Sequence, residues 1–182
     1  MNEDAIPMPG SGRFIPKQKT QLYARSLESP VFVSMYDICR LGEPETGAED
    51  AGRIGITALH GETLHGYRCE DIRAFYQWCP NGLCKGFTQT LMCRFYGSEP
   101  HFNHMMRFMC RRNAEYVMLL PRHKMPYLVV GNDAGGIDIA PRSVEHQTFV
   151  MECPYSYVPL PYYDGPLDIT DCTEPELMKE IY

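Results

Sequence analysis

The sequence predicts an α+β domain: a single compact domain with a mostly antiparallel sheet, a few short helices and extended N- and C-terminal arms. Two observations predict it. Short β-branched and aromatic runs recur between turn signals, as the strands of hairpins do. Apolar residues at helical spacing occur in only a few segments. The chain has 182 residues, of which 44% are hydrophobic and 22% charged, so it is long enough to bury one core.

The expected strands are short. Residues 30–37 read Pro-Val-Phe-Val-Ser-Met-Tyr-Asp, a β-branched and aromatic run with turn formers nearby. Similar runs are found at 54–59, 115–120, 125–130, 137–140 and 148–152. The turn Pro121-Arg-His-Lys separates two of them. A second turn, Gly131-Asn-Asp-Ala-Gly-Gly136, predicts that 137–140 returns as a partner strand.

Three segments have apolar residues at helical spacing, and we expect helices there. The segments are 70–78, 86–95 and 102–112. Their apolar positions are Ile72, Phe75 and Tyr76 in the first, Phe87, Leu91 and Phe95 in the second, and Phe102, Met105, Met106 and Met109 in the third.

The chain divides into three zones. Residues 1–20 are rich in Pro, Gly and polar residues, which predicts an arm that is flexible or laid over the surface. Residues 21–153 form the α+β domain. Residues 154–182 begin as a Tyr/Pro-rich tail that can continue neither a helix nor a central strand. This tail either docks in the aromatic groove of a partner or wraps its own domain. Its acidic end, 174–182, is expected to contain a turn or two of helix.

The net charge and the lack of membrane-span and secretory-signal patterns indicate where the protein works and which partners it binds. No apolar run approaches the length of a membrane span, and the first residues have neither a basic start nor an apolar stretch. We therefore expect an intracellular protein whose eight cysteines stay reduced. The net charge of −6 argues against a bulk attraction to nucleic acid.

The densest group of metal-ligating residue types lies between positions 60 and 93. Its members are His60, His65, Cys69, Cys79, Cys84 and Cys93. The Pro-Asn-Gly turn between Cys79 and Cys84 is the kind of turn that presents two thiolates to one zinc ion. The spacing differs from a C-x2-C pair, and cysteines packed as small hydrophobic residues are the alternative.

A thiol-dependent enzyme is the second hypothesis. Cys84 or Cys79 would be the nucleophile, His65 the base, and Asp71 the acid that orients the base. The chain contains no G-x-S-x-G, phosphate-binding loop, dinucleotide fingerprint or H-E-x-x-H motif. We therefore expect a protein that binds partners rather than an enzyme, and we assign no catalytic residue.

The predicted helix 102–112 has a basic side. Arg107, Arg111 and Arg112 would lie there and could contact an acidic protein surface or a nucleic-acid backbone. The alternative is an ordinary solvated helix face opposite a methionine stripe in the core.

Several short motifs resemble the adenovirus early-region-four 34-kilodalton protein family. They are His65-Gly-Tyr67, Trp78-Cys79-Pro80, Gly82-Leu83-Cys84, Gln89-x-Leu91, Phe102-Asn103, Arg122-His123, Tyr127-Leu128 and the segment from Gln147 to Cys153. The Arg-rich helix that the family has after Cys153 is replaced here by the Tyr/Pro tail and the acidic end. The resemblance extends from His65 to Cys153.

The resemblance implies a viral early adaptor protein that binds host proteins and links them to a cullin–elongin ubiquitin ligase, together with another viral protein. Its location would be the host nucleus, the cytoplasm or both. It also implies bound zinc, with Cys79, Cys84 and Cys153 as ligands; we add His65 and His146 to complete the shell.

The elongin-binding contact of the family has its nearest match on the predicted helix 102–112 and just beyond it. Met106, Cys110 and Ala114 would share one helix face, as a helix that docks into a groove requires. A core role for the same three residues is the alternative. A third hypothesis for the whole chain is a structural subunit that docks into a larger assembly through its arms.

Overall fold

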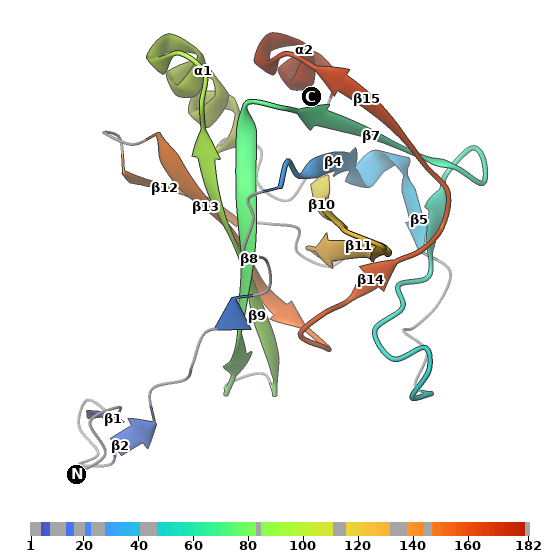
Figure 1. The fold of residues 1–182 in the computed structure, drawn as a ribbon, viewed down its shortest axis with the longest axis vertical. Helices are drawn as coiled ribbons and strands as arrows, with labels where there is room; N and C mark the ends of the chain where they lie inside the picture. The colour runs from blue at the N-terminus through green and yellow to red at the C-terminus, as the bar shows by residue number, and fades with distance from the viewer. Residues whose placement is uncertain are drawn as a thin grey trace.

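Two β-sheets pack face to face, and two short helices lie side by side at one end of them (Figure 1). The computed structural model describes residues 5–7, 14–16, 21–22, 28–40, 47–82, 85–110, 116–131, 138–143 and 147–180. Nearly all the strand pairs are antiparallel, so the predicted fold class, a single mostly antiparallel α+β domain with few helices, is confirmed.

The five-stranded sheet has the order β12-β13-β9-β8-β3. Its strands are β3 (Gln21–Leu22), β8 (Ile72–Asn81), β9 (Gly86–Phe95), β12 (Asp138–Ser143) and β13 (Thr148–Ser156). The six-stranded sheet has the order β14-β11-β10-β4-β7-β15. Its strands are β4 (Val31–Ser34), β7 (Leu64–Cys69), β10 (Tyr116–Arg122), β11 (Met125–Val130), β14 (Tyr162–Tyr163) and β15 (Leu167–Cys172).

The other elements are short. Two small hairpins consist of β1 (Ala5–Pro7) with β2 (Phe14–Pro16), and β5 (Ile38–Arg40) with β6 (Ile56–Ala58). The helices are the 3-10 turn η1 (Met35–Asp37), α1 (Glu99–Met109) and α2 (Glu174–Glu180). The 3-10 turn ends the strand that we expected over 30–37, because the Ser34 side chain accepts a hydrogen bond from the Tyr36 amide and so caps the turn.

The long hairpin β8–β9 corrects two predictions. Residues 70–78 and 86–95 were expected to be helices, and they form strands instead. Burial alternates along both strands, so Ile72 and Tyr76 face the core whereas Phe75 faces outward. The three apolar residues matched a helical spacing by coincidence. Cross-strand pairing over ten residues then outweighed any local preference.

Most of the other predicted elements are present. The hairpin of β10 and β11 forms where two strands and a turn were expected, with Met118 opposite Val130. β6 and β13 fall within or overlap the runs 54–59 and 148–152. One partner differs: β12 pairs with β13, so it belongs to the five-stranded sheet and does not return beside β11.

The core lies between the two sheets and below the helices. The six-stranded sheet contributes Phe32, Tyr116, Met118, Leu120, Leu128 and Val130, and the five-stranded sheet contributes Ile72, Ala74, Tyr76, Leu91, Cys93, Phe95, Phe149, Met151 and Cys153. The helix predicted over 102–112 is confirmed as α1, and its stripe of Phe102, Met105, Met106 and Met109 is buried in this core. Burial of that stripe is what holds a helix of three turns in place.

The C-terminal segment folds back onto the domain. β14 pairs with β11, β15 pairs in parallel with β7, and α2 buries Leu177 in the core. Thr173 caps α2, because its amide and hydroxyl both donate to the Glu176 carboxylate. Of the two roles predicted for the tail, the structure shows that it wraps its own domain. The helical turns expected near the end are confirmed.

The two faces of the six-stranded sheet are both covered. Its second face packs Val31, Val33, Leu64 and Leu119 against partly buried residues that include Ile38 and Ile56 of the β5–β6 hairpin. Over the outer face of the five-stranded sheet, by contrast, lies no helix or strand that the structure describes (Figure 1). None of the described helices is long and apolar enough to span a bilayer.

Burial of two weakly acidic groups predicts a loss of stability at alkaline pH. Burial raises the pKa of the Cys93 thiol and that of the Tyr76 phenol. The folded protein therefore keeps these protons at a pH where the unfolded chain has lost them, so rising pH favours unfolding. We expect the free energy of unfolding, measured with urea, to be level near pH 8 and to fall above about pH 9. A level profile up to about pH 11 would contradict this assignment.

Candidate protein-binding surface

The outer face of the five-stranded sheet carries three cross-strand rows of side chains. Since residues directly opposite one another on paired strands point to the same face, the register identifies each row. The rows are Arg73, Arg94 and Thr148; Phe75, Met92 and Val150; and Gln77, Thr90 and Glu152. We call these three rows the outer face.

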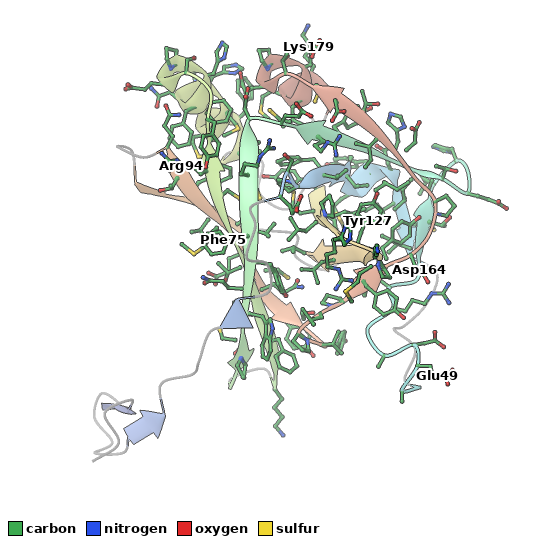
Figure 2. The ribbon with its side chains drawn as sticks, in the orientation of Figure 1. Glu49, Phe75, Arg94, Tyr127, Asp164 and Lys179 are labelled. Atoms are coloured by element: carbon green, nitrogen blue, oxygen red, sulfur yellow. The ribbon has the colours of Figure 1, made fainter. Side chains whose placement is uncertain are left out.

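The middle row of the outer face is apolar. Phe75 is partly buried, Met92 is 37% exposed, and Val150 between Met92 and β12 is only 6% exposed. Figure 2 shows Phe75 and Arg94 on the side of the sheet that faces away from the six-stranded sheet. A methionine beside an aromatic ring gives a surface that adapts to the shape of an apolar partner.

Two arginines form the row beside it. Arg73 on β8 and Arg94 on β9 are directly opposite each other, an arrangement in which like charges repel. Arg73 donates a hydrogen bond to the Ser29 hydroxyl, and the Arg94 guanidinium lies 5.1 Å from the centre of the Tyr96 ring. Among the described residues, neither arginine forms an ion pair with a carboxylate. An anionic ligand at this row would relieve the repulsion.

Two of the predicted zinc ligands point in opposite directions. Cys79 on β8 lies opposite Thr88 of β9, and Cys153 on β13 lies opposite Gln89 of β9. Neighbouring residues of one strand face opposite sides of the sheet. Cys79 therefore points to the same side of the sheet as the outer face, whereas Cys153 is fully buried in the core, and a single ion could not bind both.

The third described candidate ligand, His65, belongs to the other sheet. It lies on β7, with Nδ1 3.3 Å from an Asp168 carboxylate oxygen and Nε2 3.1 Å from the Thr170 hydroxyl. Cys84 and His146 lie outside the described residues. Within the described part of the chain, no three His, Cys, Asp or Glu side chains are grouped as metal ligands. Zinc binding stays a prediction that rests on the group of ligand-type residues in the sequence and on the resemblance.

The residues proposed for a thiol enzyme are also apart where the structure describes them. Cys79 faces away from the six-stranded sheet, on which His65 lies. Burial, and then the nearby Glu152 carboxylate, raise the pKa of the Cys79 thiol. A nucleophilic cysteine needs the opposite shift, because the thiolate is the reactive form. The arrangement of Cys79 thus gives no support to catalysis.

The residues predicted to bind a partner through α1 divide between core and surface. Met106 is 9% exposed and packs in the core, whereas Arg107 and Cys110 are exposed. Ala114, Arg111 and Arg112 lie outside the described residues. Met106 therefore follows the core alternative rather than the groove-binding one.

The outer face was missed because two of its three strands, β8 and β9, were predicted to be helices. A partial signal for it was present in the sequence: between 87 and 95, the apolar residues Phe87, Leu91, Cys93 and Phe95 alternate with Thr88, Thr90 and Arg94, and only Gln89 and Met92 depart from the alternation. Such alternation is typical of a strand with one face in the core and one in solvent. It would have placed Arg94 and Met92 together on an exposed face.

Fold and surface together define the class of this protein: an α+β domain of two packed sheets, with one sheet face that carries a pair of arginines and an apolar row and over which none of the described helices or strands lies. Comparison with protein-family models, with curated proteins and with solved structures found no match.

Proposed function

We propose that this protein is a binding adaptor whose outer face recognises an acidic segment of a partner protein. One observation carries the proposal: Arg73 and Arg94 stand directly opposite each other, with no described carboxylate paired to either, beside the apolar row in which Met92 is exposed and Phe75 is partly buried. Guanidinium groups bind carboxylates through paired hydrogen bonds. The apolar row offers contact area for an aliphatic or aromatic anchor of the same segment.

The chemistry of the surface favours a protein over a nucleic acid as the partner. Nucleic-acid binding draws on a series of cationic contacts to successive phosphates. The outer face offers two arginines, followed by an apolar row and then by Glu152. The chain as a whole carries a net charge of −6. An acidic peptide with apolar residues between its carboxylates matches this pattern, and a phosphate backbone does not.

The adaptor role that the resemblance implies needs a second surface. Target binding is assigned here to the five-stranded sheet. Recruitment of a cullin–elongin ligase, on behalf of a virus and with another viral protein, stays a proposal. The exposed residues that could serve this recruitment are Arg107 on α1 and Cys110 directly after it, because Met106 is buried in the core.

Charge reversal at Arg94 tests the proposal. The probe is a fluorescent peptide that alternates Glu with Leu and Phe, and fluorescence anisotropy measures its affinity. Arg94→Glu is expected to weaken binding by about tenfold or more, since it replaces an attraction with a repulsion. Added salt should weaken the binding of the wild-type protein as well.

The matched control is Lys179→Glu, which reverses the charge of an exposed lysine on α2, away from the outer face. It should leave the affinity unchanged. Equal binding by the wild-type and Arg94→Glu proteins would refute the proposal. If a single-stranded oligonucleotide of equal charge binds better than the peptide and loses affinity in Arg94→Glu, the surface is a nucleic-acid site instead.

A further inference from the structure

Two cysteines meet at the ends of β7 and β15. The parallel register runs from Leu64 beside Leu167 to Cys69 beside Cys172, which makes the two cysteines direct neighbours. Adjacent strands lie about 4.8 Å apart, and disulfides join Cα atoms separated by about 4.4–6.8 Å. Cys69 is buried in the core, and the partly exposed Cys172 packs against that same core. Both thiols therefore lie on one face of the sheet.

The neighbouring contacts hold this register in place. One residue earlier on each strand, the Arg68 guanidinium donates to both Asp171 carboxylate oxygens, at 2.6 and 3.0 Å. The Cys172 thiol donates to the Arg68 carbonyl oxygen over 3.7 Å. No other two described cysteines are register partners. A bond between these two sulfurs would thus need rotation of the side chains and no separation of the strands.

We propose that Cys69 and Cys172 form a two-thiol redox site, which a low-molecular-weight disulfide such as oxidised glutathione converts to a disulfide. The Cys172 thiolate attacks the small disulfide, forms a mixed disulfide and releases one small thiolate. The Cys69 thiolate then attacks the Cys172 sulfur and releases the second. Two protein thiols are oxidised, one small disulfide is reduced to two thiols, and the two protein protons pass to those products.

The order of the two steps follows from the surroundings of the sulfurs. Cys172 is the more exposed thiol, so it can meet a dissolved disulfide first. Burial raises the pKa of Cys69, which makes that thiol a poor first nucleophile. Once Cys172 carries a mixed disulfide, the Cys69 thiol lies beside the reacting sulfur. This proximity compensates for the low thiolate fraction of Cys69.

The bond would fasten the C-terminal segment to the domain. β15 and α2 follow one another directly, and α2 anchors Leu177 in the core. A disulfide at Cys172 closes a loop that contains most of the domain, which restricts the unfolded chain and stabilises the folded one. Oxidation would then protect β15 and α2 from opening and would leave the outer face unchanged.

Peptide mapping and a thermal melt test the inference on the full chain. The reduced protein is incubated with oxidised glutathione, alkylated, digested and analysed by mass spectrometry. We expect a Cys69–Cys172 linked peptide, a mass lower by two hydrogen atoms, and a rise in Tm of roughly 5 °C or more. Dithiothreitol should reverse all three.

Two variants separate this site from general thiol oxidation. Cys172→Ser changes a partly exposed position and should prevent both the link and the rise in Tm. Cys110→Ser removes an exposed thiol directly after α1 and should change neither. The thermal melt of reduced Cys172→Ser shows whether that variant folds. If it does not fold, the peptide map of the oxidised wild-type protein still tests whether Cys69 and Cys172 are linked. An unresolved glutathione adduct at Cys172, no link, or a link between other cysteines would overturn the inference.

Discussion

Replacing Phe102 with Ala is expected to lower the free energy of unfolding by about 3–5 kcal/mol. Phe102 is 2% exposed and carries α1 into the core. Its ring centre lies 6.1 Å from that of Phe95 on β9 and 6.3 Å from that of Phe149 on β13. Alanine would remove these contacts and leave a cavity at the helix-covered end of the sheets. Urea denaturation, followed by the fluorescence of Trp78, measures the loss.

The same helix offers a matched control. Phe108 is 36% exposed and contacts His104 on the solvent side, with ring centres 4.8 Å apart. Phe108→Ala removes an equal number of atoms and should cost less than about 1 kcal/mol. If both variants lost the same small amount of stability, α1 would not be packed into the core as described.

Replacing Gln89 with Leu is expected to destabilise the protein by roughly 3 kcal/mol, although leucine is apolar and similar in size. Gln89 is fully buried on β9 and links the two sheets. Its Nε2 donates to the Val129 carbonyl oxygen at 2.8 Å and to the Tyr76 hydroxyl oxygen at 3.1 Å. Its Oε1 accepts from the Gly131 amide at 3.2 Å. Leucine can form none of these hydrogen bonds. The buried Val129 carbonyl oxygen and the partly buried Gly131 amide would each lose the partner that Gln89 provides.

Gln77→Leu is the comparison, because Gln77 stands on the outer face of β8 and is partly exposed. Its substitution should change the free energy of unfolding by less than about 0.5 kcal/mol. Hydrogen exchange gives a second measurement: the Gly131 amide should exchange faster in Gln89→Leu and not in Gln77→Leu. Equal stabilities of the two variants would show that Gln89 does not link the sheets.

Local signals predicted the fold class and several elements. The methionine and phenylalanine stripe from 102 to 109 predicted α1, because a helix this short is held by one apolar face. The hairpin of β10 and β11 has its turn at Arg122–Met125, between two apolar runs. The acidic segment that begins at Glu174 likewise predicted a final helix. In each case the residues that decide the structure lie within a few positions of one another.

The strands β8 and β9 could not be predicted from neighbouring residues alone. A helix and a strand both place Ile72 and Tyr76 on one side, and three apolar residues cannot separate a period of 3.6 from one of 2. The burial of alternate positions, which does separate them, depends on the sheet that packs against the hairpin. The same dependence places Cys79 and Cys153 on opposite faces of the sheet, since a shift of one residue in register exchanges the two faces.

The sequence by itself determined the α+β class, the acidic net charge, the methionine stripe of α1 and the terminal helix, because each depends on composition or on near neighbours. Only the tertiary structure decided that Arg73 lies opposite Arg94, that Cys69 lies beside Cys172, and that Cys79 and Cys153 point to opposite faces of the sheet. These juxtapositions depend on which strands pair and in which register. Pairing between distant segments is selected by burial of whole faces and by loop closure, and neither is written in any short stretch of the chain.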